Sequence, residues 1–265
     1  MIDSHCHLFF DSIKNNISEV ISNAKKNNVT GILSINTKKE DFDSHYKLIE
    51  KYKSIFISYG EHPENINNHN IISAKEIISL CSLEKIIGIG ETGIDLFYSK
   101  DNFGAQLKSF ENHIEASIKT NIPLIIHQRN SETEIIDILS NFKNDNLKLV
   151  MHCFTGSKKM RDFCIESNYY ISLTGIITFK NANELRNTIK DIPLNLILIE
   201  TDSPFLTPEP FRGVKPNQPS YVYYICEYLA SFFNLKLKEF EIITDNNFYS
   251  LFNKAIRYKE ISYEN

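Results

Sequence analysis

Short apolar runs recur along the whole chain, and longer amphipathic segments separate them. Apolar runs of this kind, rich in Ile, Leu and Val, predict buried strands, whereas the segments between them predict helices. We expect eight strands, at residues 1–7, 29–36, 55–60, 86–91, 123–127, 147–152, 170–174 and 196–202. Strand and helix therefore alternate from the start of the chain.

Three of the intervening segments carry clear helical signals. In residues 103–120, apolar positions follow one another at spacings of three and four, which puts them on one face. These positions are Leu107, Phe110, Ile114 and Ile118. Ser131 is followed three residues later by Glu134, which is typical of a capping box at the start of a helix. From about Pro219 onward we expect two further helices, packed over the outside of the molecule.

Eight strands alternating with helices over 265 residues predict a (β/α)8 TIM barrel, whose usual length is about 250 residues. No Pro-, Ser- or Gly-rich linker divides the chain, so we expect a single domain over residues 1–265. A doubly wound open sheet is the alternative. It would normally carry Gly-x-Gly-x-x-Gly after the first strand, and this chain has none there.

Composition and charge narrow the functional classes. A hydrophobic content of 42% and a charged content of 23% are those of an ordinary globular protein. No apolar run approaches the length of a membrane span, and the first strand leaves no room for a signal peptide, so we expect a cytoplasmic protein. The net charge of −4 argues against a generally basic nucleic-acid binder but permits a local basic rim.

The five cysteines are odd in number, widely scattered and never spaced as Cys-x-x-Cys. This usage indicates neither a disulfide framework nor a thiolate zinc site. Strand alternation predicts that Cys6 and Cys153, which adjoin histidines, point toward the helical layer as small buried hydrophobes.

Polar residues stand at the ends of five predicted strands. The first strand carries His5 and His7, which alternation places on one face. Four other strands end in one polar residue each: Glu91, His127, His152 and Asp202. Singly, each has a plain structural explanation, such as a buried histidine bonded to backbone or a carboxylate capping a helix. Because the carboxyl ends of barrel strands converge on one mouth, five such ends favour a metal site.

Six ligands exceed the three protein groups that one catalytic zinc normally uses. Two cations about 3.5–4 Å apart, bridged by a carboxylate, fit the number better. Such a pair activates a water and clamps both the attacking and the leaving oxygen of an ester. The sequence therefore predicts hydrolysis.

Seven motifs occur in order along most of the chain: IDSHCH, GEHP, GIGETGID, PLIIHQR, HCFTGS, ETDSPFL and FRGVKPNQPSYV. Together they closely resemble the TatD family of metal-dependent deoxyribonucleases. The resemblance implies an amidohydrolase-like TIM barrel with extra C-terminal helices and 3′→5′ exonuclease activity on DNA or RNA. It also implies two divalent ions per chain (Mg²⁺, Mn²⁺ or Zn²⁺). One ion would be held by His5, His7, Glu91 and Asp202, and the other by Glu91, His127 and His152.

Further residues are expected to support this site. His62 either contacts a substrate phosphate or orients its own loop. Glu200, two residues before Asp202, points into the barrel, where it would hold the second nitrogen of a metal-bound histidine, unless a lysine or a serine is its partner. Arg129 and Arg212 are candidates for binding phosphate, because a guanidinium matches two phosphate oxygens.

Other side chains near the mouth are less distinctive. Asp95 is expected to cap the segment after the fourth strand, with the support of a metal ligand as the alternative. Phe97, Tyr98 and Phe211 are candidates for stacking on a terminal base, or they are core or lid aromatics. Glu61 departs from the family pattern, as does Leu96 after Asp95, and both departures leave the substrate preference open.

We therefore predict a binuclear metal hydrolase of phosphodiesters, a 3′→5′ exodeoxyribonuclease in which Glu91 and Asp202 are catalytic. Asp202 would take the proton from the attacking water. The enzymatic alternative is an amidohydrolase or esterase acting on a small molecule or an aminoacyl ester. Such enzymes often bridge their metals with a modified lysine, where this chain has Glu91. A non-catalytic binding module is the remaining alternative. A nucleic-acid end is the only partner expected, with no membrane and no obligate protein partner.

Overall fold

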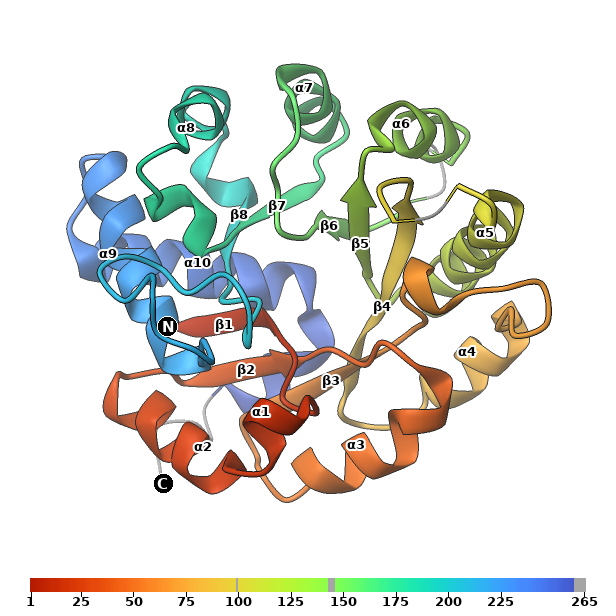
Figure 1. Cartoon of the computed structure of the whole chain (residues 1–265), viewed down its shortest axis with the longest axis horizontal. Helices are drawn as coiled ribbons and strands as arrows, with labels where there is room; N and C mark the ends of the chain where they lie inside the picture. The colour runs from red at the N-terminus through yellow and green to blue at the C-terminus, as the bar shows by residue number, and fades with distance from the viewer. Residues whose placement is uncertain (99, 143–145, 260–265) are drawn as a thin grey trace.

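The computed structural model describes residues 1–98, 100–142 and 146–259. The described residues form one parallel sheet of eight strands in sequence order, ringed by helices (Figure 1). The strands are β1 (Ile2–Cys6), β2 (Gly31–Ser34), β3 (Ile55–Tyr59), β4 (Ile86–Asp95), β5 (Leu124–Arg129), β6 (Leu149–Met151), β7 (Tyr170–Leu173) and β8 (Ile197–Ile199). This nearly closed barrel confirms the expected (β/α)8 TIM fold.

Most of the helices follow the strands as the sequence pattern predicts. They are α1 (Asp11–Lys14), α2 (Ile17–Lys26), α3 (Phe42–Ile49), α4 (Ala74–Leu80), α5 (Phe103–Thr120), α6 (Glu132–Ser140), α7 (Lys158–Glu166), α8 (Asn183–Ile189), α9 (Val222–Phe232) and α10 (Leu237–Leu251). Short 3₁₀ helices include η3 (Gly175–Thr178) and η6 (Asn253–Tyr258). Within the described ranges, no helix combines the length and the apolar character that crossing a membrane requires.

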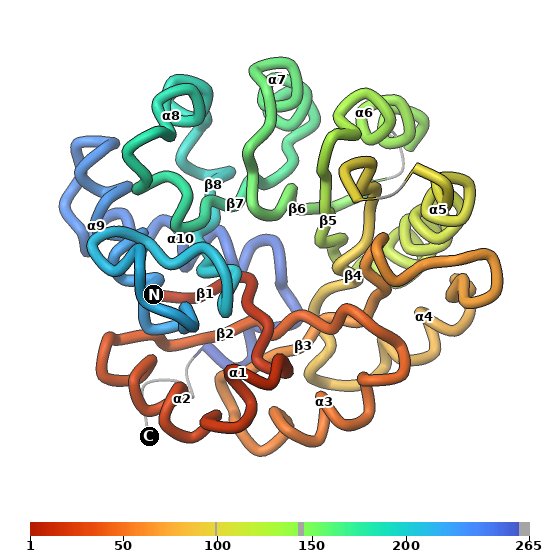
Figure 2. The backbone as a smooth tube through the Cα atoms, viewed as in Figure 1, coloured from red at the N-terminus to blue at the C-terminus, as the bar shows by residue number. Residues whose placement is uncertain are grey.

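The first strand and the segment after the last strand close the ring. The Asp202 amide donates to the His5 carbonyl at 2.9 Å, and the His7 amide donates to the Ser203 carbonyl at 2.7 Å. The buried Asp3 carboxylate accepts hydrogen bonds from the amide and the hydroxyl of Thr201, at 2.8 and 2.6 Å. Figure 2 shows the β8–α9 connection lying beside the N-terminal strand. The first strand and the segment that follows β8 are thereby held together.

One apolar cluster fills the interior of the barrel on the side of α10. Seven strands contribute one inward side chain or more: Ile2, Leu33, Ile35, Phe56, Ile87, Ile125, Val150 and Leu198. The cluster is completed by residues of α10 and of the segment after it: Phe248, Tyr249, Leu251, Phe252 and Ala255. The two expected C-terminal helices are confirmed, but the expectation that both pack only on the outside was wrong. The end of α10 and the residue after it close the barrel, because Phe248 and Phe252 both pack into this cluster, with ring centroids 5.0 Å apart.

This closure gives a stability prediction. Phe252 is fully buried, so Phe252→Ala is expected to lower the free energy of unfolding by about 3–5 kcal/mol, as in other deletions of a core aromatic. Urea unfolding at constant pH measures the loss. The matched control is Ile256→Ala in η6, which is 56% exposed and should change stability by less than about 0.5 kcal/mol. Equal effects of the two substitutions would contradict the closure.

Several element boundaries differ from the sequence expectation. β4 continues past Glu91 to Asp95, while β6 and β8 end before His152 and Asp202. The pairing register shifts between Asp3 and Cys6 in β1 and between Ile89 and Thr92 in β4. Such irregularities re-aim side chains, and both lie beside expected metal ligands.

The expected capping box at the start of α6 is not formed. The Ser131 hydroxyl donates to the Ile94 carbonyl at 2.6 Å instead of capping the helix. The Ser131 hydroxyl therefore bonds to the distant Ile94 carbonyl and not to an amide of its own helix, and this hydrogen bond connects the start of α6 to β4.

Candidate metal centre

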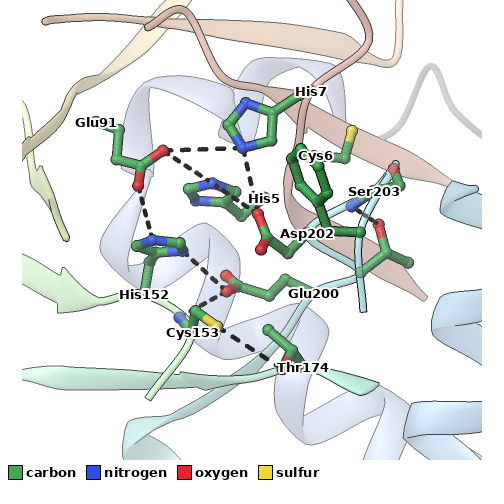
Figure 3. A network of polar contacts seen from close by, with 12 residues as sticks. His5, Cys6, His7, Glu91, His152, Cys153, Thr174, Glu200, Asp202 and Ser203 are labelled. Carbon is green, nitrogen blue, oxygen red and sulfur yellow. Dashed lines mark hydrogen bonds and ion pairs between the residues drawn. The ribbon is translucent and has the colours of Figure 1, made fainter. Parts of the chain in front are cut away.

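The polar strand ends meet in one cluster at the carboxyl-terminal mouth of the barrel (Figure 3). Glu91 lies at its centre and is only 2% exposed. One carboxylate oxygen lies 3.0 Å from His127 Nδ1 and 2.8 Å from His152 Nε2. The other lies 3.4 Å from His5 Nε2 and 3.8 Å from His7 Nε2. Glu91 therefore faces histidines on both sides.

The first group of possible ligands comprises His5, His7 and Asp202. His7 Nε2 lies 3.2 Å and His5 Nε2 lies 3.6 Å from the same Asp202 oxygen. Among the described residues, neither ring nitrogen of the buried His5 has a hydrogen-bond partner, and His7 Nδ1 has none either. A divalent cation between these side chains would satisfy His5 Nε2, the nitrogen that faces Glu91 and Asp202. Imidazole with carboxylate is a donor set that zinc and manganese accept.

The second group comprises His62, Glu91 and His127, whose possible ligand atoms lie within 4.8 Å of one another. His62 Nε2 is 3.3 Å from His127 Nδ1 and 3.4 Å from Glu91 Oε1. The structure thus brings His62 beside Glu91 and His127, two of the candidate metal ligands. His62 also shapes its own loop, because its Nδ1 accepts a hydrogen bond from the Glu64 amide at 3.2 Å.

His152 is positioned from behind by Glu200. His152 Nδ1 lies 3.3 Å from Glu200 Oε1, which also accepts the Cys153 amide at 2.7 Å. The other oxygen accepts the Ser172 hydroxyl at 2.6 Å. Glu200 therefore contacts both a histidine, as expected, and a serine, which was the alternative. A carboxylate at Nδ1 leaves Nε2 facing Glu91.

The two carboxylates and His5 are in protonation states that suit a cation. Burial raises the pKa of Glu91, but His152, His62 and His127 outweigh it and hold the pKa well below its usual range. Burial likewise opposes the lowered pKa of Asp202, which His7 and His5 maintain. Burial lowers the pKa of His5. Ionised carboxylates and a neutral imidazole are the forms that bind metal. Burial lowers the pKa of His152 and of His127, but the carboxylates beside them outweigh it and raise both pKa values, so a cation would replace a proton there.

The comparisons with known proteins agree with this geometry. The family model described as TatD related DNase matches residues 2–253. The chain belongs to the TatD family. This membership makes it a metal-dependent hydrolase, and it confirms the family resemblance drawn from the motifs.

Relatives of this TatD protein cover nearly its whole length. A Buchnera aphidicola protein described as an uncharacterized metal-dependent hydrolase is 41% identical, over 96% of this chain and 99% of the relative. Escherichia coli YcfH, with the same description, is 32% identical over 96% of both chains. The solved structure of the Escherichia coli TatD homolog YjjV aligns with a TM-score of 0.87 and 26% identity. That alignment covers 96% of this chain and 98% of YjjV.

In this TatD protein, Asp95 fills both of the roles that the sequence offered as alternatives. Its Oδ1 accepts the amides of Phe97 and Tyr98 at 2.8 and 3.1 Å, which is the expected capping role. Its Oδ2 lies 2.9 Å from His127 Nε2, so Asp95 also orients that ring. Sequence reasoning preferred capping to this supporting role, because it ended the strand at Glu91. The available signal was the alternation of Glu91, Gly93 and Asp95 along one strand.

The two cysteines beside the histidines differ from each other. Cys6 is fully buried in the outer core, and its thiol lies 3.8 Å from the Leu33 carbonyl, as predicted. The prediction for Cys153 was wrong. Cys153 lies after the end of β6 with φ +46°, and its thiol is 3.9 Å from the Thr174 hydroxyl, near Glu200 (Figure 3). Strand alternation does not apply beyond Met151.

The two candidate arginines are both stacked on aromatic rings. The Arg129 guanidinium lies 3.9 Å from the Phe97 centroid and 4.6 Å from the Tyr98 centroid. Arg212 lies 4.0 Å from the centroid of Phe179, which follows η3. Stacking fixes the plane of a guanidinium and leaves its N–H edge available. Phe211, a candidate for base stacking, is itself stacked on Tyr221, with ring centroids 5.1 Å apart.

Proposed function

We propose that this TatD-family hydrolase removes nucleotides from the ends of nucleic-acid strands as a 3′→5′ exonuclease, with DNA as the preferred substrate. The observation that carries the proposal is the position of the Glu91 carboxylate between two pairs of histidines, His5 and His7 on one side and His127 and His152 on the other. A bridging carboxylate of this kind is typical of two-metal sites that hydrolyse phosphate esters.

We assign two divalent ions to the centre. Glu91 would bridge them. The first ion would also be held by His5, His7 and Asp202, and the second by His127 and His152. Two cations polarise a phosphate ester and stabilise both its attacking and its leaving oxygen.

The protein side chains would then divide the remaining work. Asp202 is 13% exposed by its side chain, against 2% for Glu91, so Asp202 is the carboxylate that an attacking water can approach. We assign proton transfer from that water to Asp202. Glu200 and Asp95 keep His152 and His127 in place. His62 lies within reach of a phosphate at the same mouth.

We propose further that residues 1–265 act as one catalytic domain without an obligate protein partner. His5 and Asp202, from opposite parts of the chain, contribute to the same mouth. The proposed cellular location is the cytoplasm, where ends of DNA and RNA strands arise.

A substrate panel tests the proposal. Purified protein supplied with Mg²⁺, Mn²⁺ or Zn²⁺ is expected to shorten single-stranded DNA from its 3′ end, and EDTA is expected to abolish the reaction. End-labelled oligonucleotides resolved on a gel report both rate and polarity. Hydrolysis of amides, lactones or aminoacyl esters with no shortening of any oligonucleotide would contradict the proposal and favour the amidohydrolase alternative.

Arg212 is expected to bind a phosphate beyond the cleaved bond. Arg212→Ala should lower kcat/KM on single-stranded DNA about 10- to 150-fold, since a charge-assisted contact is worth about 1.5–3 kcal/mol. A small chromogenic phosphodiester, which occupies only the metal centre, should be hydrolysed at an almost unchanged rate. Equal losses on both substrates would place Arg212 at the reacting bond instead.

Glu200 is expected to matter through His152. Glu200→Gln should weaken binding of the second metal about 10- to 100-fold, because the carboxylate no longer orients the histidine. Competition with a chromogenic chelator measures the affinity. Ser172→Ala is the matched control, since it removes the other side-chain partner of Glu200 and leaves its carboxylate beside His152. An unchanged affinity in Glu200→Gln would refute the positioning role.

A further inference from the structure

Two exposed aromatic rings stand beside the first group of metal-facing side chains. Phe10 follows β1 and is 40% exposed, and Phe205 follows β8 and is 49% exposed. Their centroids lie 5.6 Å apart with the rings nearly perpendicular. Residues from distant parts of the chain therefore form one aromatic pair where the barrel closes.

This aromatic pair is built directly onto His7. The His7 ring lies 5.2 Å from the Phe10 ring and 6.3 Å from the Phe205 ring, measured between centroids. Backbone hydrogen bonds also connect both aromatic residues to candidate metal ligands. The Phe10 amide donates to the His7 carbonyl at 3.3 Å, and the Phe205 amide donates to the Asp202 carbonyl at 3.0 Å. A group bound at the metal-facing atoms would thus have the pair as its neighbour.

Other aromatic rings around the mouth already carry a cation. Arg129 lies over Phe97 and Tyr98, and Arg212 lies over Phe179. By contrast, no lysine or arginine of the described ranges lies over Phe10 or Phe205. The pair thus offers apolar surface without a positive charge, which suits a planar ring and not a phosphate.

The mouth therefore has two chemically different sides. The segments after β1 and β8 carry the aromatic pair, whereas β4 and β5, across the ring of strands, carry the Phe97–Tyr98–Arg129 group (Figure 1). Arg212 lies further along the connection after β8, over Phe179, and not over the aromatic pair. A phosphodiester held between the two ligand groups would meet an apolar surface on one side and a guanidinium on the other. A nucleotide has this same division, because its base is planar and apolar and the next linkage is an anion.

We infer that Phe10 and Phe205 form a stacking platform for the unpaired terminal base of the strand. The inference rests on the proposed function and names its substrate class: ends whose last base is present and unpaired. Stacking on an aromatic ring accepts all four bases, so no base preference is expected. Because the platform holds a single base, a duplex end must fray before it binds.

Oligonucleotides lacking one terminal base test the platform. Phe205→Leu keeps an apolar side chain but removes the aromatic face, and it should lower kcat/KM on single-stranded DNA about tenfold. For the wild-type protein, kcat/KM should fall by a similar factor when the terminal nucleotide lacks its base. This loss should occur when the abasic nucleotide is at one end of the strand and not at the other. On that abasic strand, Phe205→Leu should cause no further loss. Losses that multiply instead would overturn the inference.

A binding measurement separates this inference from the proposed function. The probe is a DNA strand that ends in the fluorescent base 2-aminopurine and carries phosphorothioate linkages, which protect it from cleavage. The metal-loaded wild-type protein should quench the fluorescence of this base, and the Phe10→Leu and Phe205→Leu variants should not. Ile242→Ala on α10, 49% exposed like Phe205, is the matched control and should quench normally. Metal content and circular dichroism of each variant verify folding.

The outcomes are distinct. Cleavage of oligonucleotides with multiplying losses would leave the nuclease function standing and remove the platform. Quenching that depends on Phe10 and Phe205 without any cleavage would support the platform and remove the nuclease function. Neither cleavage nor quenching by wild-type protein would overturn both.

Discussion

Glu91→Gln is expected to abolish stable binding of both divalent ions and to lower kcat at least roughly a thousandfold. The reason is that one carboxylate oxygen faces His127 and His152 while the other faces His5. The substitution preserves the size of the side chain but removes its charge. Elemental analysis of saturated protein should find close to two equivalents in the wild type and a large loss in the variant.

The neighbouring position supplies a control for this experiment. Thr92 lies on the same strand, is fully buried, and its hydroxyl has no hydrogen-bond partner among the described residues. Thr92→Val should therefore keep both metals and nearly all activity. A Glu91→Gln variant that still binds two equivalents and turns over normally would show that Glu91 is no bridge.

Asp202→Asn is expected to separate proton transfer from metal binding. The amide cannot take a proton from water, so kcat should fall by a factor on the order of 10²–10⁴. The metal on the His127 side should remain, because among the described residues the Asp202 carboxylate lies beside His5 and His7 and forms no ion pair with His127 or His152. Metal content near one equivalent or above, combined with the loss of kcat, is the expected result.

The metal content of Asp202→Asn, compared with that of Glu91→Gln, distinguishes the roles of the two carboxylates. Loss of both metals in Asp202→Asn would make this carboxylate a bridge as well. A normal kcat would assign the proton transfer to another group at the mouth.

Much of the candidate site could be predicted from sequence, for a local physical reason. The residue type at the end of an apolar run is visible in the sequence, and parallel strands bring such ends to one mouth whatever the rest of the packing. This reasoning found His5, His7, His127, His152 and Asp202 together with Glu91, and the structure brings all six into one cluster. It also found Glu200, because alternation places it beneath Asp202.

Other features depended on where the strands stop, which local patterns do not determine. β4 runs on to Asp95 because it pairs with β5 as far as Arg129, so Asp95 reaches His127. β6 stops at Met151, which frees Cys153 from strand alternation. Pairing between strands decided both, and neither follows from the apolar runs alone.

The sequence by itself determined the barrel class and the polar residues that meet at its mouth, because both depend on short-range periodicity and residue type. Only the tertiary structure decided which side chains become neighbours across the ring. It placed His62 beside His127, closed the barrel floor with Phe252, and joined Phe10 to Phe205. These contacts join residues far apart in the chain, and their geometry is set by barrel closure and packing, which no local pattern encodes.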